Sequence, residues 1–284
     1  MDFATYVRQK EDRARAARIG RLLTMDRRRT DPPLLAIGNN WTRAHFDGSF
    51  WLSSAPAGLP SLSLVFVQSR EGNTGADNPA DLGGGDIDLH LIYEGLSRVA
   101  ADAVLAGATT AIGSVFFSVW HPEIVELRRA LGLPRHPAQI VMSGRGNLDI
   151  DNTLLFNVPQ VPVFVLAGPE CRERCANPLS SRPWVTMIPT NDDGLDSALR
   201  ELWKRGIGRV SCVGGRSLAT SLLDAGVVQD VYLTTTDTSA GEPETPFYVG
   251  RRKPALDLVV RKRTAPGDTP QLEFEHFAAH FGAM

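Results

Sequence analysis

The stretch that decides the fold is Arg209-Val-Ser-Cys-Val-Gly-Gly-Arg-Ser-Leu-Ala-Thr-Ser-Leu-Leu-Asp-Ala-Gly226. A short apolar strand runs into Gly214-Gly215 and directly on into a helix, with a glycine again at the helix end. Two glycines let the backbone turn sharply and approach a ligand closely. The helix start offers free N–H groups and a partial positive charge, with Arg216 and Ser217 beside it, and this combination favours a phosphate. A plain turn between strand and helix is the alternative, because the stretch is neither the three-glycine dinucleotide fingerprint nor a Walker loop.

Outward from this stretch, short apolar strands alternate with helices from residue 34 onward. The expected strands are rich in Val, Ile, Leu and Phe; they are Leu62–Gln68, Ala103–Ala108, Gln139–Ser143, Val161–Ala167, Trp184–Ile188, Arg209–Val213 and Asp230–Asp237. The expected helices are Asp86–Ala100, Pro122–Leu131, Asp193–Lys204 and Ser217–Ala225. This order predicts an α/β domain with a mainly parallel mixed sheet flanked by helices. Two later runs, Ala255–Arg261 and Gln271–Phe277, predict antiparallel edge strands at the C-terminus.

Residues 1–33 differ in charge from the rest of the chain. The first thirty carry nine Lys or Arg against four Asp or Glu, whereas the whole chain has a net charge of −2. Apolar residues lie among the arginines over Phe3–Met25, and we predict an amphipathic helix there that ends before Asp31-Pro32-Pro33. A solvated helix packed on the domain or on a second subunit is the interpretation that such a charge run favours. An RNA- or membrane-binding arm is the alternative, and the acids speak against a transit peptide. The chain is thus divided into a basic helical extension, residues 1–33, and one domain, residues 34–284.

Composition excludes several classes of protein. With 43% hydrophobic and 22% charged residues in 284, the chain is neither disordered nor fibrous, and it can bury a sizeable core. Its net charge of −2 argues against nucleic acid as a partner. The longest apolar runs, such as Leu62–Val67, are strand-sized, and the N-terminus lacks the apolar core of a secretory signal. Three cysteines, Cys171, Cys175 and Cys212, fit a reducing compartment, so we expect a soluble cytoplasmic protein that contacts no membrane.

Three further segments carry chemistry in register with the Gly-Gly turn. The first is Arg98-Val-Ala-Ala-Asp-Ala-Val-Leu-Ala-Gly-Ala-Thr-Thr110, a helix end that leads into a strand. The second is Gln139-Ile-Val-Met-Ser-Gly-Arg-Gly-Asn147, a strand followed by a glycine-flanked turn. The third is Gln68-Ser-Arg-Glu-Gly72, a turn directly after a strand. Each segment alone is modestly specific, but four in order and spacing are a better signal.

Over Ser63 to about Phe247, the order of these motifs resembles the reductase domain of the bifunctional riboflavin-biosynthesis deaminase/reductase. The resemblance implies a dihydrofolate-reductase-like fold, NADPH as cofactor and a homodimer. It places the pyrophosphate at Gly214, Gly215, Arg216 and Ser217, and the nicotinamide side at Gly107, Thr109 and Thr110. Because NADPH carries a 2′-phosphate and arginine pairs well with phosphate oxygens, Arg145 beside Ser143 is the first candidate for that contact. Arg182 is the second candidate, and an ordinary surface arginine is the alternative for each.

The substrate side departs from the family pattern. Ser69 and Glu71 occupy the place of a Ser-x-Asp-Gly turn that faces the substrate, with a glutamate for the aspartate. Val213 stands where the family has a glutamate, and Ala111–Phe117 is apolar where the family has an arginine and an Asp-Asp-Pro. These changes leave the cofactor side nearly intact and bear on the substrate. The aromatic, polar segment Asn39–Gly58 either folds over the substrate pocket or is a loop pinned by its aromatics.

The bifunctional members of the family carry a zinc deaminase, whose site needs His-x-Glu and then Pro-Cys-x-x-Cys. His121-Pro-Glu123 and Pro169-Glu-Cys-Arg-Glu-Arg-Cys175 match this pattern only superficially, because three residues separate the cysteines. We expect no metal there, but a helix start at Pro122 and a pair of reduced thiols. The remaining histidines form no ligand-spaced set, and His90 is expected to be a packed residue in a helix.

Together these features predict an NADPH-dependent reductase that resembles 5-amino-6-(5-phosphoribosylamino)uracil reductase. Hydride would pass to a C=O or C=N carbon of a bound heterocycle or sugar phosphate, with Glu71 orienting the substrate or relaying a proton. One alternative is a reductase of the same fold that acts on another small heterocycle, carbonyl or imine compound. The other is a non-catalytic binding protein of this fold.

Overall fold

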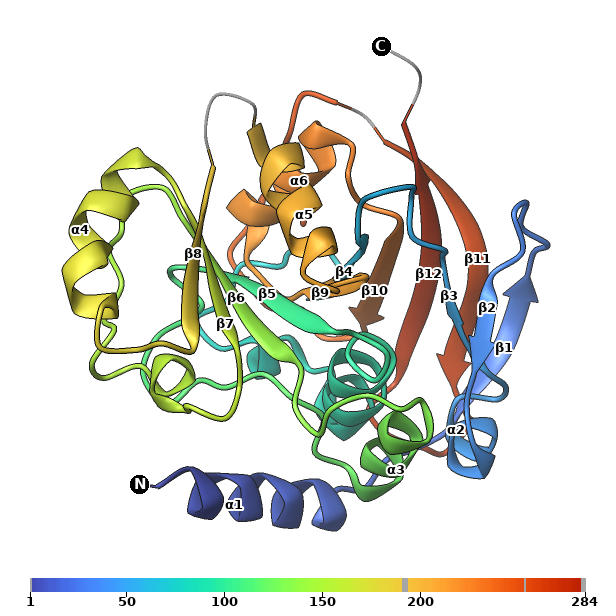
Figure 1. Cartoon of the computed structure of the whole chain (residues 1–284). Helices are drawn as coiled ribbons and strands as arrows, with labels where there is room; N and C mark the ends of the chain where they lie inside the picture. Colours follow the sequence, from blue (N-terminus) through green and yellow to red (C-terminus); the bar gives the residue numbers. More distant parts are fainter. Residues whose placement is uncertain (1, 191–193, 253, 282–284) are drawn as a thin grey trace.

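The computed structural model describes residues 2–190, 194–252 and 254–281 of the chain. Within these residues ten strands form one sheet in the order β1-β11-β12-β10-β4-β9-β5-β6-β7-β8 (Figure 1). Its strands are β1 (Leu22–Arg27), β4 (Ser61–Gln68), β5 (Ala103–Gly107), β6 (Ala138–Ser143), β7 (Val163–Ala167), β8 (Val185–Pro189), β9 (Arg209–Cys212), β10 (Asp230–Thr236), β11 (Ala255–Thr264) and β12 (Leu272–His280). From β10 to β8 all neighbours are parallel, whereas β12, β11 and β1 are antiparallel. The predicted mainly parallel mixed sheet with antiparallel C-terminal strands is confirmed, but the edge of the sheet beside them is β1, so neither β11 nor β12 is an edge strand.

Helices connect the parallel strands and cover both faces of the sheet. They are α1 (Phe3–Ala16), α2 (Asn40–His45), α3 (Pro122–Ala130), α4 (Pro169–Leu179), α5 (Gly194–Lys204), α6 (Arg216–Ala225), the π-helix η2 (Ile87–Leu96) and the short 3₁₀ segments η1 (Pro79–Leu82) and η3 (Leu154–Asn157). A small second sheet pairs β2 (Leu35–Ile37) with β3 (Phe50–Leu52). The predicted start of the α5 helix at Asp193 lies outside the described residues. No helix in the described part of the chain is long and apolar enough to span a membrane.

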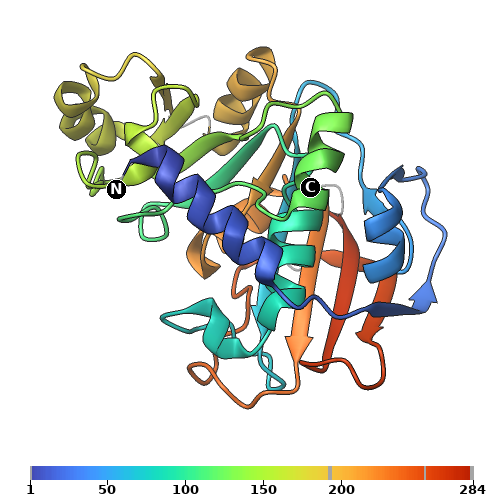
Figure 2. The same ribbon diagram turned by 90° about the horizontal axis from the view of Figure 1, so that it is seen from below.

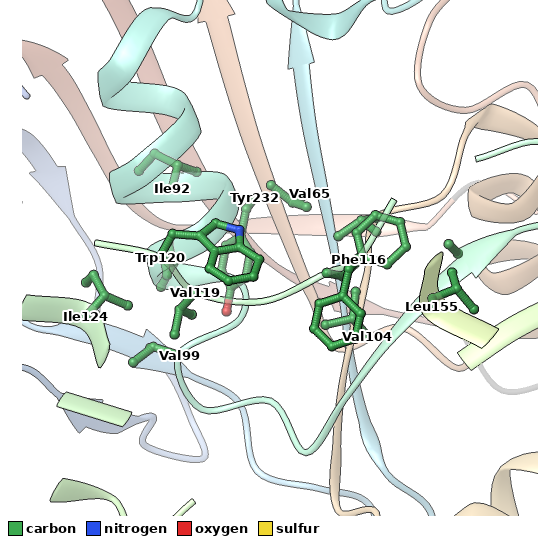
Figure 3. Packing of buried hydrophobic residues seen from close by; sticks show 14 of the residues in the cluster. Val65, Ile92, Val99, Val104, Phe116, Val119, Trp120, Ile124, Leu155 and Tyr232 are labelled. Atoms are coloured by element: carbon green, nitrogen blue, oxygen red, sulfur yellow. The ribbon is translucent and has the colours of Figure 1, made fainter. Parts of the chain in front are cut away.

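Each face of the sheet has its own apolar core. On one face α5 and α6 contribute buried leucines such as Leu202 and Leu222. On the other face lie η2, α3 and α1, which Figure 2 shows side by side. Here the fully buried Trp120 packs among Ile92 of η2, Ile124 of α3 and neighbouring valines (Figure 3). Burial of both faces accounts for the nearly continuous apolar sequences of the central strands.

The N-terminal segment corrects one prediction. The helix is present, capped by the Asp2 carboxylate on the Thr5 amide at 3.0 Å, but it ends at Ala16 rather than near Met25. Residues 22–27 instead form β1, which pairs with β11 at the sheet edge. The helix ends where Ala17 adopts an extended conformation, and Leu22 is fully buried in the strand that pairs with β11. The antiparallel ladder satisfies the backbone of this segment, and it outweighs the helical spacing of the apolar residues.

Helix α4 was not predicted, because its apolar face is made largely of cysteine. Its buried residues are Cys171, Cys175 and Leu179, at the i, i+4, i+8 spacing of one helix face. The two thiols are free and buried, and their sulfur atoms lie 3.8 Å apart. Burial and the neighbouring Cys175 raise the pKa of Cys171 to about 11, so this thiol stays protonated and packs as a small apolar group.

Candidate functional site

The predicted site residues follow the carboxyl ends of four neighbouring parallel strands. Ser69 and Glu71 follow β4, the Gly214–Ser217 turn follows β9, Gly107–Thr110 ends and follows β5, and Ser143–Arg145 ends and follows β6. Because β4, β9, β5 and β6 are adjacent in the sheet, the topology brings these segments to one edge. Ligands of open α/β sheets bind at this edge. The fold therefore assembles all four motifs, while the role of each residue stays a prediction.

The two glycines after β9 differ in what surrounds them. A Cβ atom on Gly214 would lie 2.5 Å from Cδ2 of Leu218 and 3.2 Å from the amide nitrogen of Gly107. Gly214 therefore allows the turn after β9 to touch the end of β5. A Cβ atom on Gly215 would meet nothing within 4 Å, and its φ of −70° suits any residue. The protein itself gives no steric reason for Gly215, so the space above it is free for a ligand.

The N-terminus of α6 is arranged for an anion. In the described residues no acceptor takes the amides of Gly215, Arg216 or Ser217. The first turn of α6 carries no acid, in contrast to α3, α4 and α5, which carry Glu123, Glu170 and Asp196 there. The free N–H groups and the positive end of the helix dipole are therefore not neutralised by a carboxylate of the helix's own first turn.

The turn after β6 contains both predicted phosphate ligands, of which Arg145 is exposed and Ser143 stabilises the turn. The buried Ser143 hydroxyl accepts a hydrogen bond from the Gly146 amide at 2.9 Å and so stabilises the turn. Arg145 is exposed, and its guanidinium forms no ion pair with the described residues. Arg182, the second candidate, is instead held by the Asp151 carboxylate at 2.8 Å and by the Pro178 carbonyl at 2.8 Å. Its charge supports the loop around Asp151, which leaves Arg145 as the free cation at this turn.

The Ser69–Glu71 turn presents a carboxylate fixed by hydroxyl groups. Glu71 accepts hydrogen bonds from the Ser69 hydroxyl at 2.9 Å and from the Ser239 hydroxyl at 2.8 Å. The Ser239 bond, followed by the Glu71 backbone amide and Ser69, lowers the pKa of Glu71, so the side chain is ionised at neutral pH. Beside it lies an open groove of about 670 Å³ between the loop after β4 and the loop after β10.

The loop after β10 is a part of the site that the sequence did not predict. Ser239, Ala240, Gly241, Pro243, Glu244 and Pro246 line the groove together with Glu71, Gly72 and Asn73. Glu242 of the same loop does not line the groove but forms an ion pair at 4.0 Å with Arg216, which links this loop to the α6 turn. Glycine, proline and acids over 237–246 are the only sequence signal of this loop, and they indicate a turn rather than a binding surface.

The departures from the family pattern have structural roles. Val213 is buried and donates its amide to the Leu105 carbonyl at 2.9 Å, so this position is part of the core. In Ala111–Phe117, Phe116 and Phe117 are buried, and the Phe116 ring packs edge-on against Phe3 of α1 at 4.7 Å. The apolar segment therefore anchors the N-terminal helix.

The histidine motifs also lie in packed regions. His90 is buried, and its Nδ1 atom lies 2.7 Å from the Glu94 carboxylate within η2, as expected of a packed residue. His121 occupies the N-cap position of α3 without a side-chain hydrogen bond to the helix, and its ring stacks on Trp41. Burial lowers the pKa of His121 to about 4. Across the described residues, no group of three or more His, Cys, Asp or Glu side chains is positioned to hold a metal ion.

Comparison with known families agrees with this architecture. The model of the RibD C-terminal domain matches residues 91–267, which is more than half of the chain. The chain belongs to the RibD C-terminal domain family. The resemblance to the reductase domain of the riboflavin-pathway enzyme, read from the four motifs, is thereby confirmed at the level of the family. A comparison with curated protein sequences gives no match.

Solved structures share the fold at low sequence identity. A pyrimidine reductase-like protein of Corynebacterium diphtheriae is 20% identical, with a TM-score of 0.56, and the match covers 78% of this chain and 93% of that one. RibD of Acinetobacter baumannii is 17% identical, with a TM-score of 0.59, over 78% of this chain and 58% of that one. The riboflavin biosynthesis reductase of Saccharomyces cerevisiae is 17% identical, with a TM-score of 0.53, over 80% and 93%. The predicted dihydrofolate-reductase-like fold is confirmed.

Proposed function

We propose that this chain is an NADPH-dependent reductase that transfers hydride to a C=O or C=N carbon of a small heterocyclic compound. The observation that carries the proposal is the N-terminus of α6. It combines three amides without an acceptor, no acid in the first turn and open space above Gly215. These are the features that a pyrophosphate needs in order to approach a backbone closely.

The four motifs divide the cofactor among them in this proposal. Gly214–Ser217 would hold the pyrophosphate, and Gly107, Thr109 and Thr110 would border the nicotinamide ribose. Arg145, with Ser143 shaping its turn, would pair with the 2′-phosphate, because a guanidinium matches phosphate oxygens in geometry and charge. The cofactor supplies the hydride, and the protein contributes alignment of the two reactants, which is the larger part of catalysis for such a transfer.

Glu71 is proposed to orient the substrate. Its carboxylate is held by two hydroxyls at the mouth of the groove, and each of its oxygens keeps a lone pair free. The Arg216–Glu242 ion pair links the loop that forms one wall of the groove to the α6 turn, so a ring bound in the groove would lie near the proposed cofactor. By family, the first compound to test is 5-amino-6-(5-phosphoribosylamino)uracil, the compound named for the reductase of Thermotoga maritima.

A reductase of the same fold with a different substrate is the second candidate. Val213 stands where the family pattern has a glutamate, so a polar contact to the substrate is missing. The buried Phe116 and Phe117 stand where that pattern has a polar recognition segment. On the family resemblance we also propose that the enzyme is a homodimer. From the sparse cysteines and the net charge of −2 we propose that it acts in the cytoplasm and binds no nucleic acid.

The proposal is tested by titrating the purified chain with NADPH and NADH, following cofactor fluorescence and thermal stability. We expect saturable binding of NADPH and a higher melting temperature in its presence. Oxidation of NADPH is then measured with the uracil compound beside a panel of other carbonyl and imine compounds. A chain that neither quenches NADPH fluorescence nor gains thermal stability from it is not a reductase of this kind and is instead a binding protein that shares the fold.

A further inference from the structure

The groove beside Glu71 is open to solvent, and most of the residues that line it are exposed. Its volume of about 670 Å³ lies in the range of pockets that bind small organic ligands. Two loops form its walls, residues 71–73 after β4 and residues 239–246 after β10. The chemistry of these two walls decides which substrate they can recognise, given the proposed reductase function.

A dense set of hydrogen bonds holds the two loops together. The Thr74 amide and hydroxyl donate to the Thr245 carbonyl at 2.7 and 2.8 Å, and the Glu242 amide donates to the Gly75 carbonyl at 2.7 Å. The Thr245 hydroxyl accepts from the Gly75 amide at 3.0 Å and donates to the Glu242 carbonyl at 2.5 Å. A Cβ atom on Gly241 would lie 3.0 Å from the Gly75 carbonyl oxygen, so the loops are in direct backbone contact. The groove is therefore formed before a ligand arrives.

The charges around the groove have one sign. Among its nine lining residues, Glu71 and Glu244 are acidic and none is Lys, Arg or His. Glu244 forms no ion pair with the described residues, and the nearby cations are Arg70, 3.7 Å from Glu71, and Arg216, 4.0 Å from Glu242. A phosphate dianion in this groove would face two carboxylates without a lining cation, which is unfavourable.

The polar groups of the groove complement a different chemistry. The two carboxylates accept hydrogen bonds, whereas the side-chain amide nitrogen of Asn73 has no acceptor in the described residues and can donate one. A nitrogen heterocycle that carries an amino group and a carbonyl offers this pattern of donors and acceptors. A phosphate offers only acceptors and charge.

We propose that the groove binds an unphosphorylated, amino-bearing nitrogen heterocycle, and that Glu71 and Glu244 select against the phosphate ester of the same compound. The enzyme then acts after the phosphate has been removed, or on a substrate class that never carries one. Glu244 is a specificity-determining residue in this view, because it lines the groove without taking part in the cofactor site.

The inference is tested by comparing 5-amino-6-(5-phosphoribosylamino)uracil with its dephosphorylated form in NADPH oxidation. We expect the wild type to prefer the dephosphorylated compound by about tenfold or more in kcat/KM, as one unfavourable charge contact can produce. Glu244→Gln should narrow this preference several-fold through a lower KM for the phosphorylated compound. Glu201→Gln, at a half-buried acid of α5 that pairs with Arg205, is the control and should leave the preference unchanged. A wild type that prefers the phosphorylated compound, or a preference that Glu244→Gln does not alter, overturns the inference.

A second measurement separates this outcome from a failure of the proposed function. Calorimetric titration of the chain with the two pyrimidines needs neither NADPH nor turnover, and tighter binding of the dephosphorylated compound supports the inference. If Arg70→Gln selectively loses binding of the phosphorylated compound, the phosphate is held by Arg70 and the inference is refuted. Absence of NADPH binding refutes the reductase proposal alone, since the pyrimidine comparison still reports on the groove.

Discussion

Alanine substitutions at the two adjacent glycines of the α6 turn should differ in their effects: Gly214→Ala should lower stability, whereas Gly215→Ala should weaken NADPH binding with little change in stability. In Gly214→Ala the new methyl group would stand 2.5 Å from Leu218 and 3.2 Å from the backbone of Gly107. Overpacking of this kind costs about 1–3 kcal/mol of unfolding free energy. In Gly215→Ala the methyl group meets no protein atom within 4 Å and the backbone needs no change. Lower chain entropy in the unfolded state and a weaker N-cap oppose each other there, so the unfolding free energy should stay within about 1 kcal/mol of the wild type.

The same pair separates folding from cofactor binding. If the pyrophosphate lies on the amides of Gly215, Arg216 and Ser217, the methyl group of Gly215→Ala occupies the space through which its oxygens approach. Loss of one charge-assisted hydrogen bond of about 1.5–3 kcal/mol weakens NADPH binding by about 10- to 150-fold. Urea unfolding followed by circular dichroism gives the stability, and fluorescence titration gives the Kd. A Gly215→Ala variant that binds NADPH within threefold of the wild type would refute the assignment of this turn to the pyrophosphate.

Three other predictions concern charged groups. Arg145→Ala should weaken NADPH binding by about 10- to 100-fold and leave NADH binding unchanged, since only NADPH carries the 2′-phosphate; equal losses in fluorescence titrations would mean that another group holds it. Glu242→Gln should tighten NADPH binding several-fold, because it frees Arg216 from its 4.0 Å ion pair, and an unchanged or higher Kd would show that Arg216 does not contact the cofactor. Burial raises the pKa of Asp88 from 3.8 to about 6, so the native state binds more protons than the unfolded state between these values and its stability falls as pH rises through this window. Asp88→Asn should therefore gain up to about 3 kcal/mol over the wild type at pH 8, with the gain vanishing near pH 4 in urea unfolding, whereas a pH-independent difference would contradict the shift.

Much of the fold could be predicted because its signals are local. The central strands are buried on both faces, so each is a short apolar run bounded by turn residues, and predicted and observed bounds differ by one or two residues. Helices α3, α5 and α6 show apolar residues at helical spacing and clear ends, as in Gly226, which adopts a left-handed conformation after α6. Four motifs could be placed at one edge because parallel strands bring their carboxyl ends together.

What could not be predicted depends on contacts between distant segments. The apolar residues of 22–27 do not by themselves favour a strand over a helix. Pairing with β11 makes this segment a strand. The groove arises where the loop after β4 meets the loop after β10, more than 160 residues later in the chain. No local pattern in either loop predicts this contact, so the acidic lining of the groove could be identified only from the three-dimensional structure.

The position of β1 has a consequence for folding during synthesis. Leu22 of β1 pairs with Thr264 of β11. Strand β1 is synthesised early and cannot pair until β11, near the end of the chain, has been synthesised. At the usual pace of translation, about 5–20 residues per second, the ribosome needs tens of seconds to supply that partner. During this time Leu22 and the exposed apolar side chains of Leu23 and Met25 have no sheet to join. The surrounding arginines keep this waiting segment strongly charged, a property that discourages association between nascent chains.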